Sequence, residues 1–279
     1  MNLMAGILKL IKFVFRLPPI KWYRIRRYRR RFLTARGWQG LHYGIFDSFS
    51  EARAALPESK VTSWQPDDND WYASEYQKLE IIDYPILFWL QQLIHSGSML
   101  FDFGGHVGVT YRKYAPYLDY PDDFRWIVCE QDIVVKQAQV LLEKWGGPHL
   151  SFVTDFKLAA TSTIFHSAGC VQYVEQPIAT LLAELETLPQ HLILSKIPLY
   201  QQATKVTLQN TGYSISPNWL FNREAFIESI HRLGYELIDS WPCPTRKNYI
   251  PFYANYNVEE MSGLYFKRKY PDSNQQYSG

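Results

Sequence analysis

From residue 98 onward, short apolar runs alternate with segments whose apolar residues recur every three or four positions. The first pattern predicts buried strands, and the second predicts helices with one apolar face. The predicted strands cover 99–103, 125–130, 150–154, 162–169 and 191–197. Between these strands, helices are expected to begin near Val107, to cover 132–145, and to follow Pro177, which suits a first helical turn.

The pattern closes with one more helix and two more strands. Asn222 is a typical helix cap and Gly234 a typical helix end, and apolar residues lie between them at helical spacing. The runs 235–241 and 262–269 predict the last strands. Strands that alternate with helices indicate the α/β class, with a mostly parallel sheet covered on both faces. Ligands of such sheets bind at the carboxyl ends of the strands.

Two segments outside this alternation have weaker patterns. Residues 37–97 form a mixed lead-in, in which apolar spacing predicts a helix over about 71–95 that Pro85 should kink or split. Residues 198–220 have no clear periodicity and are rich in Gln, Thr, Asn, Ser and Tyr. They are expected to form a loop after the fifth strand that walls a site for a polar molecule.

The N-terminal residues differ from the rest in charge. Residues 1–36 hold eleven Lys and Arg and no acid, which leaves 18 Lys and Arg against 27 Asp and Glu in the remainder. Residues 1–17 predict an amphipathic helix that Pro18 and Pro19 end, and a polybasic run with interleaved aromatic residues follows. The helix is too short and too charged to span a bilayer.

Three interpretations of this basic arm stay open. It can lie on an anionic membrane surface, pack against its own body, or hold nucleic-acid phosphates. The apolar helix before the basic run favours the membrane surface. The three cysteines are widely spaced and form no CxxC pair, which predicts reduced thiols in a cytoplasmic protein. The chain is therefore expected to be cytoplasmic and peripheral on the inner face of the membrane.

The segment "DFGGHVG", residues 102–108, follows the first strand of the regular region and opens a helix, where glycine loops bind ligands. An acid at Asp102 would repel a phosphate, which argues against a nicotinamide oxidoreductase. Glu130 ends the next strand, where an acid accepts hydrogen bonds from ribose hydroxyls, and Asp155 follows the third strand. These acids predict a pocket for a positively charged amino acid joined to a nucleoside without phosphate.

These motifs resemble those of the class I S-adenosylmethionine-dependent methyltransferases over residues 98–270. "LFDFGGHVG" stands where that family has an acid followed by spaced glycines, and "WIVCE" stands where its ribose-binding acid lies. Residues 37–270 also resemble bacterial methyltransferases encoded with polysaccharide biosynthesis genes, through "GWQG", "SFSEA", "SAGCVQYVEQP" and "GYELIDSW". The resemblance implies a Rossmann-like seven-stranded sheet, mostly parallel, whose last strand is antiparallel.

The charge pattern and the resemblance together predict a division of the chain, and the resemblance also implies a cofactor site. A basic helical arm (1–36), lead-in helices (37–97), an S-adenosylmethionine-binding domain (98–270) and a flexible tail (271–279) are expected. The residues implied to bind S-adenosylmethionine are Asp102, Gly104, Gly105, His106, Gly108, Glu130, Gln131, Asp155, Phe156 and Ser167. His106 departs from the family motif, because it stands at the middle glycine. Its side chain can bond the methionine carboxylate of the cofactor or cap the helix.

A hydroxyl acceptor must lose a proton, which calls for a base. His166, near the end of the fourth strand, and Tyr173, after it, are the candidates for catalysis, each against the alternative that it packs in the core. No residues have metal-ligand spacing, and the acidic residues 66–70 predict a solvated loop. The expected function is O-methylation of a saccharide or lipid-linked glycan intermediate. The alternatives are an RNA-directed methyltransferase and a non-catalytic scaffold with this fold.

Overall fold

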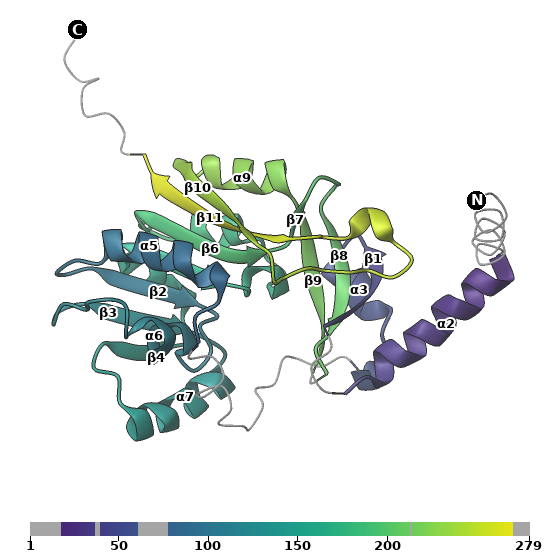
Figure 1. The fold of residues 1–279 in the computed structure, drawn as a ribbon, viewed down its shortest axis with the longest axis horizontal. Helices are drawn as coiled ribbons and strands as arrows, with labels where there is room; N and C mark the ends of the chain where they lie inside the picture. Colours follow the sequence, from purple (N-terminus) through teal and green to yellow (C-terminus); the bar gives the residue numbers. More distant parts are fainter. Residues whose placement is uncertain (1–17, 37–39, 61–77, 213, 270–279) are drawn as a thin grey trace, which may run out of the picture.

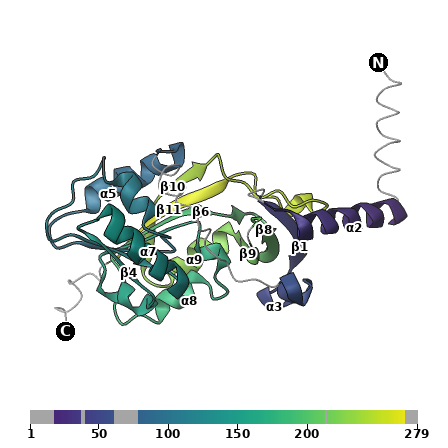
Figure 2. The ribbon, with the colours of Figure 1, turned by 90° about the horizontal axis from the view of Figure 1, so that it is seen from below.

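The computed structural model describes residues 18–36, 40–60, 78–212 and 214–269. In these residues a large sheet with helices on its faces lies beside a smaller sheet, and a long helix projects from the smaller sheet (Figure 1 and Figure 2). The predictions made for residues 1–17, 66–70 and 271–279 lie outside the described residues.

The large sheet confirms the predicted fold class. It is seven-stranded, with the order β10-β11-β6-β5-β2-β3-β4. Strands β6, β5, β2, β3 and β4 run parallel, and β11 is antiparallel to both of its neighbours. The bounds are β2 Met99–Phe103, β3 Arg125–Cys129, β4 Leu150–Val153, β5 Ile164–Ala168, β6 His191–Ile197, β10 Tyr235–Cys243 and β11 Met261–Arg268.

The strand order places a switch point between β2 and β5. From β2 the chain continues outward to β3 and β4, and it then returns to β5 and β6 on the other side of β2. The loops that leave β2 and β5 therefore diverge and leave a crevice at the carboxyl ends of these strands. In open α/β sheets, ligands bind in this crevice.

Helices cover both faces of the large sheet, as alternation of strands and helices predicts. One face packs Leu100, Trp126 and Ile193 against helices α5 (Tyr84–Leu93) and α6 (Val109–Tyr114). The opposite face packs phenylalanine and leucine side chains against α8 (Ile178–Ala183) and α9 (Arg223–His231). Helix α7 (Asp132–Trp145) packs Val134 and Ala138 beside the glycine loop residue Val107.

Several predicted helix boundaries agree with the structure. The Asn222 side chain accepts a hydrogen bond from the Ala225 amide and caps α9. Pro177 precedes α8, and Gly146, with a φ of +67°, ends α7. The helix after the glycine loop begins at Val109, two residues later than expected, because Gly108 adopts a left-handed backbone as its cap.

Residues 198–220 are not the loop that the sequence predicts. They form β7 (Leu199–Tyr200), β8 (Lys205–Asn210) and most of β9 (Ile215–Asn222). With β1 (Leu41–Phe46) these strands make a four-stranded sheet in the order β1-β8-β9-β7. This hairpin buries Thr207, Gln209 and Asn218 as well as apolar side chains. Its sequence therefore lacks the alternation of apolar and polar residues that predicts a strand. The segment 37–97 consequently contains a strand besides its helices.

Pro18 and Pro19 are the first residues of a helix in the described part of the chain. Helix α2 (Pro18–Thr34) contains the polybasic run, and proline suits a first helical turn because its missing amide hydrogen has no partner there. The last turns of α2 pack on the small sheet through Phe32, which is fully buried. The Tyr28 hydroxyl donates to the carbonyl of His42 (2.9 Å), and the Asn210 amide donates to the carbonyl of Phe32.

The helix expected over 71–95 is shorter in the described residues. Helix α5 begins at Tyr84 with Pro85 in its first turn, where proline is tolerated, so Pro85 starts the helix and does not kink it. Residues 61–77 lie outside the described part of the chain. Two further elements, α3 (Phe49–Ala54) and the 3-10 turn Ile81–Asp83, complete the region before β2.

The described helices include none that is long and apolar enough to cross a membrane. Cys129, Cys170 and Cys243 are all free thiols, as their spacing predicts. Burial raises the pKa of the Cys129 thiol to about 12, with neighbouring Glu130 and Asp155 adding to the shift. Cys129 and Cys243 are buried and act as small apolar core residues.

His42 on β1 makes the fold sensitive to acid. Burial lowers the pKa of its imidazole from 6.5 to about 4. Between these pH values the unfolded chain binds a proton that the folded chain does not, so stability falls as the pH falls. Between pH 6 and pH 5, the unfolding free energy of the wild type should fall with pH more steeply than that of His42→Leu. The expected difference in slope is about 1 kcal/mol per pH unit. Urea unfolding over this range measures both slopes, and equal slopes would contradict the prediction.

Candidate functional site

A cavity of about 640 Å³ opens at the carboxyl ends of the parallel strands, at the switch point of the large sheet. One part of its wall is the glycine loop after β2, with Glu130 and Gln131 after β3. A second part is the Ala168–Cys170 segment after β5, with Lys196 at the end of β6. The hairpin of the small sheet supplies a third part through Thr211, Ser214, Ser216 and Pro217.

The glycine loop is held in one conformation by close contacts. The Gly104 amide donates to the carbonyl of Cys129 (3.0 Å), which ties the loop to the end of β3. Gly104 has a φ of +75°, and a Cβ at this position would lie 2.3 Å from Sγ of Cys170. A Cβ at Gly105 would lie 2.4 Å from the carboxyl of Asp102. Only glycine therefore fits at both positions.

The contact between Gly104 and Cys170 predicts a measurable coupling. Gly104→Ala should lower the unfolding free energy by more than Gly234→Ala, which has a φ of +86° and nothing within 4 Å of a Cβ. The left-handed backbone alone costs about 1–2 kcal/mol, which both variants share. The additional loss in Gly104→Ala, beyond that of the control, should shrink by at least about 1 kcal/mol when Cys170→Gly is added. The second substitution removes the side chain with which the new Cβ collides. Chemical denaturation measures the wild type and the four variants, and an additive double variant would contradict the contact.

Asp102 lies beneath the loop and is 1% exposed. Its Oδ1 accepts a hydrogen bond from Nδ1 of His166 (2.7 Å), and its Oδ2 accepts one from Nε1 of Trp126 (3.1 Å). Asp102 and His166 are register partners on β2 and β5, so the strand pairing itself sets the two side chains side by side. The same carboxyl touches the backbone of the loop at Gly105. Asp102 thus fixes the loop from below and also lines the cavity.

Glu130 stands at the edge of the cavity after β3. Its Oε1 accepts a hydrogen bond from the His106 amide and its Oε2 accepts one from the Gln131 amide, both at 3.1 Å. Burial raises the pKa of this carboxyl, and Asp102 adds to the shift. The carboxyl thereby bridges the glycine loop and the start of α7, and Glu130 lines the cavity.

His106 keeps the backbone of the glycine that it replaces. Its φ is +55°, in the left-handed region that favours glycine. The N-cap of α6 is Gly108, and no side chain makes a capping hydrogen bond there. The His106 side chain therefore does not cap α6. The residue lines the cavity, and burial lowers the pKa of its imidazole to about 4. At neutral pH the ring therefore offers hydrogen-bonding nitrogens without a charge.

Not all the predicted cofactor residues reach the cavity. Asp155 is exposed, and its Oδ1 accepts a hydrogen bond from the Lys157 amide (2.9 Å) to cap the 3-10 turn Phe156–Thr161. Phe156 packs edge-on against the rings of Phe101 and Phe103. Ser167 is fully buried and donates to the carbonyl of Phe103 (2.8 Å). Residues Asp102, Gly104, Gly105, His106, Glu130 and Gln131 do line the cavity.

The two catalytic candidates have different surroundings. His166 is fully buried, pairs with Asp102, and is not among the residues that line the cavity. Tyr173 does line the cavity, but its hydroxyl donates to Oε1 of Gln209 (2.5 Å), and burial raises its pKa to about 12. The geometry therefore favours a structural role for His166 and an orienting role for Tyr173.

Several cavity residues were missed by the sequence analysis. Lys113 of α6 and Asp83 form a buried ion pair (3.1 Å), and the Tyr114 hydroxyl also donates to Asp83 (2.8 Å). Lys196 is a cation near the end of an otherwise apolar strand, and that departure from the pattern could have identified it. Arg53 of α3 reaches the site because the small sheet packs beside the large one, which no local pattern indicates.

The arrangement can bind two chemical entities in one space. The end with Glu130 and the glycine loop offers carboxyl oxygens and close backbone approach. The other end offers hydroxyl groups of Thr211, Ser214 and Ser216 and the ammonium group of Lys196. A cavity of this size is typical of sites that hold small molecules.

Solved structures of S-adenosylmethionine-dependent methyltransferases are similar to this chain. A 1,6-didemethyltoxoflavin-N1-methyltransferase from Burkholderia thailandensis, solved with S-adenosylhomocysteine, is 14% identical with a TM-score of 0.46, covering 76% of this chain and 94% of its own. A methyltransferase from Clostridium acetobutylicum is 8% identical with a TM-score of 0.47, covering 73% and 94%. The magnesium protoporphyrin IX methyltransferase of Synechocystis, solved with S-adenosylmethionine, is 14% identical with a TM-score of 0.44, covering 74% and 87%.

No protein-family model matches the chain, and no curated protein sequence matches it. The fold itself rests on the strand order, the single antiparallel strand β11 within the large sheet, and the glycine loop after β2. Together these features give the chain the Rossmann-like seven-stranded sheet.

Proposed function

We propose that the protein is an S-adenosylmethionine-dependent methyltransferase that methylates a hydroxyl group of a saccharide or glycan-lipid acceptor. The observation that carries the proposal is the single cavity at the switch point. It joins an acid-rimmed glycine loop to a hydroxyl-rich wall on the small sheet. The first end suits a nucleoside with a cationic amino-acid tail, and the second suits a polar acceptor.

The residues at the first end fit S-adenosylmethionine. Glu130 follows β3, where a carboxyl accepts hydrogen bonds from ribose hydroxyls. Asp102 and Glu130 would repel a phosphate and attract the ammonium of the cofactor, and the cofactor has no phosphate. Gly104 and Gly105 let the loop backbone pack directly on Cys170 and Asp102, where a Cβ would collide with these side chains. When bound, S-adenosylmethionine supplies a methyl group already activated on a positively charged sulfur.

This chain's residues then serve mainly to bring the acceptor beside that methyl group, and such positioning alone contributes several kcal/mol to catalysis. Tyr173 also lines the cavity, and its hydroxyl is held by Gln209. The hydroxyl groups of Thr211, Ser214 and Ser216 suit a saccharide, which presents hydroxyl groups of its own. The resemblance to methyltransferases encoded with polysaccharide biosynthesis genes supports the same acceptor class.

The proposal is tested by titrating S-adenosylmethionine into the purified full chain in a calorimeter. Folded protein that binds it can then be incubated with methyl-labelled cofactor and a panel of saccharides, glycan lipids and RNA. Label in a saccharide or glycan lipid supports the proposal. Label only in RNA favours an RNA-directed enzyme, and no binding of the cofactor by folded protein favours a non-catalytic scaffold.

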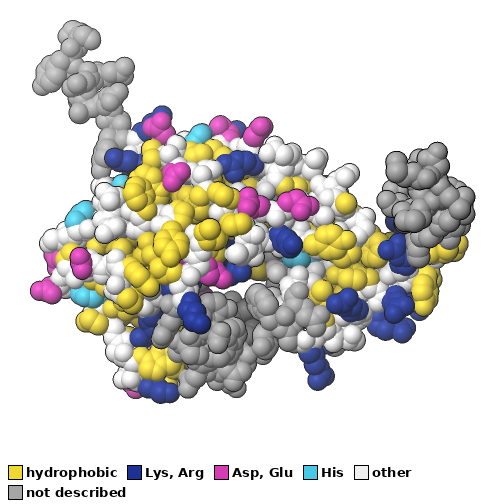
Figure 3. Space-filling model, viewed as in Figure 1, with side chains coloured by type: hydrophobic (Ala, Val, Ile, Leu, Met, Phe, Trp, Pro, Cys, Tyr) yellow, Lys and Arg dark blue, Asp and Glu magenta, His cyan; other side chains and the backbone are white. Residues whose placement is uncertain are grey.

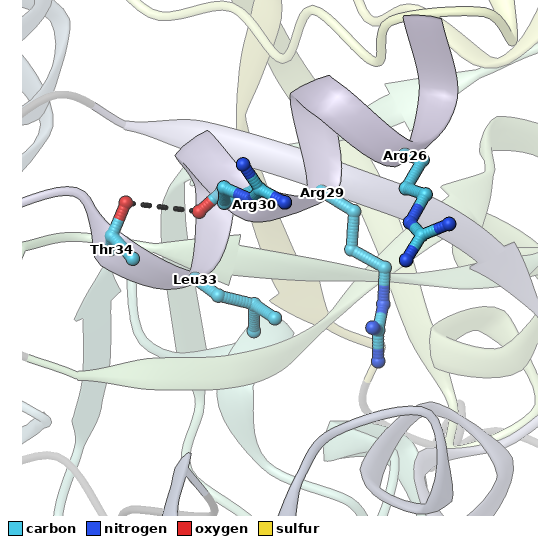
Figure 4. Close-up of a pocket in the computed structure, with 5 residues that line it drawn as sticks. All are labelled: Arg26, Arg29, Arg30, Leu33 and Thr34. Carbon is cyan, nitrogen blue, oxygen red and sulfur yellow. Dashed lines mark hydrogen bonds between the residues drawn. The ribbon is translucent and has the colours of Figure 1, made fainter. Parts of the chain in front are cut away.

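We further propose that the basic arm holds the enzyme on an anionic membrane surface, where a glycan-lipid acceptor would lie. Lys and Arg side chains gather on α2, at the end of the molecule away from the large sheet (Figure 3). Trp22 and Tyr23 are each 61% exposed, which suits the boundary of lipid headgroups. Arg26, Arg29 and Arg30 share a groove with Leu33 and Thr34 (Figure 4).

The arm proposal predicts a charge-dependent binding to vesicles. The full chain should sediment with vesicles that contain phosphatidylglycerol and not with neutral phosphatidylcholine vesicles. Replacing Arg27, Arg30 and Arg31 with glutamine should weaken this binding by roughly 100-fold, since each cation contributes about 1 kcal/mol. The matched control replaces the exposed Lys136, Lys157 and Lys267 of the body with glutamine and should bind as the wild type does. Equal binding to both vesicle types would contradict the proposal.

A further inference from the structure

Lys196 lies in the part of the cavity that the proposed cofactor site does not use. It is near the end of β6, directly after Ser195, whose carbonyl accepts a hydrogen bond from the Gly169 amide (2.9 Å). The sheet order β3-β2-β5-β6 sets β6 three strand spacings from β3, roughly 14 Å from the strand that carries Glu130. Lys196 therefore belongs to the acceptor end of the cavity.

The other cations around Lys196 have acidic partners. Lys113 pairs with Asp83 (3.1 Å), and Arg246 pairs with Glu80 (2.8 Å). In the part of the chain that the structure describes, no carboxyl lies within ion-pair distance of the Lys196 ammonium. The three cations Lys113, Arg246 and Lys196 therefore face the two acids Asp83 and Glu80, which leaves one positive charge in excess.

Asp83 is not available to balance that charge. Its Oδ2 accepts hydrogen bonds from the Lys113 ammonium and from the Glu80 amide (2.7 Å), and its Oδ1 accepts one from the Tyr114 hydroxyl (2.8 Å). The carboxyl is 2% exposed and held on both oxygens. A move toward Lys196 would break bonds in a buried network, which is costly.

The backbone holds Lys196 in place at a cost. Its φ is +58°, a left-handed conformation that costs a residue with a side chain about 1–2 kcal/mol. Its stem runs beside Gly169, where an added Cβ would lie 3.5 Å from Cδ of Lys196. Burial, followed by the charges of Lys113 and Arg246, lowers the pKa of the Lys196 ammonium, and the charges of Asp83 and Glu80 oppose this shift only in part. A bound anion would relieve this unfavourable environment, and strained residues of this kind gather at ligand sites.

We propose that Lys196 binds an acidic group of the methyl acceptor, a phosphate or a carboxylate. The assignment rests on the proposed function in that the molecule bound is the acceptor. The hydroxyl groups of Thr211, Ser214 and Ser216 line the same cavity and can bond the rest of that molecule. The acceptor class narrows accordingly from saccharides in general to those that carry a phosphate or an acidic sugar.

The test measures how fast acetic anhydride acylates Lys196 in the full chain, by mass spectrometry of its peptides. Inorganic phosphate and sodium acetate are added in separate arms, which distinguish a phosphate site from a carboxylate site. One of the two should slow acylation of Lys196 at least threefold and leave the exposed Lys157 unchanged. Because the readout is resolved by residue, anions bound to the arm do not interfere. If neither anion protects Lys196, the proposal is overturned.

Two variants separate this site from the cofactor site. Lys196→Met keeps an unbranched stem and removes the charge, and Lys196→Arg keeps the charge. Inorganic phosphate or acetate, whichever protected Lys196, should bind Lys196→Arg and bind Lys196→Met at least tenfold more weakly. S-adenosylmethionine should bind both as it binds the wild type. If Lys196→Met also binds S-adenosylmethionine at least tenfold more weakly, Lys196 belongs to the cofactor site and the proposal is overturned. If the wild type does not bind S-adenosylmethionine, that result counts against the proposed function alone.

Discussion

Asp102→Ala is expected to lower the free energy of unfolding by about 3 kcal/mol. The substitution leaves Nε1 of Trp126 and Nδ1 of His166 buried without their acceptor. Each buried group that loses its partner costs about 1–3 kcal/mol. Removal of the carboxyl also frees the backbone of the glycine loop at Gly105, which packs on it. Urea unfolding, followed by tryptophan fluorescence, measures the change.

The control for this prediction is Asp122→Ala, since Asp122 is exposed and has no hydrogen bond among the described contacts. That variant should lie within about 0.5 kcal/mol of the wild type. Asp102→Asn keeps one acceptor oxygen and should show an intermediate loss. If Asp102→Ala is as stable as Asp122→Ala, the buried hydrogen bonds of Asp102 to Trp126 and His166 do not contribute to stability as expected. Loss of cofactor binding in Asp102→Ala can be interpreted only under conditions where the variant is folded.

Glu130→Ala is the sharper test of the cofactor site. Its carboxyl lies at the edge of the cavity and accepts bonds only from the amides of His106 and Gln131, which can turn to water when it is removed. Two hydrogen bonds to a carboxylate contribute about 3 kcal/mol together, so S-adenosylmethionine should bind roughly 100-fold more weakly. Calorimetric titration measures the affinity, and unfolding free energy should change little.

Glu143→Ala provides the matched control, because Glu143 is an exposed acid on the neighbouring helix α7. It carries the same change in net charge and should bind the cofactor as the wild type does. If Glu130→Ala and Glu143→Ala bind equally, the ribose contact implied by the resemblance is absent from this chain.

The local pattern predicted the large sheet well because its strands are buried on both faces. Apolar runs such as "WIVC" occur where a parallel strand is covered by helices, and each predicted strand of the large sheet formed within a few residues of its predicted ends. The caps at Asn222 and Gly146 also act over a single turn, so the sequence carries them completely.

The small sheet was missed for the opposite reason. Its hairpin buries Thr207, Gln209 and Asn218, whose side chains are polar and give no apolar alternation. Its first strand, β1, lies more than 150 residues from its partner β8 in sequence, with Tyr43 paired to Leu208. A pairing between such distant segments depends on the fold of everything between them and leaves no local signal.

The site divides along the same line. The sequence by itself determined the glycine loop, the acid after β3 and the end of the sheet where the cavity opens, because these follow from strand order and short-range backbone geometry. Only the tertiary structure decided that His166 pairs with Asp102 under the loop, and that Lys196 and the hairpin face the loop across one cavity. Burial, strand register and charge balance each depend on segments that lie far apart in the sequence. They decide which titratable side chains line the cavity.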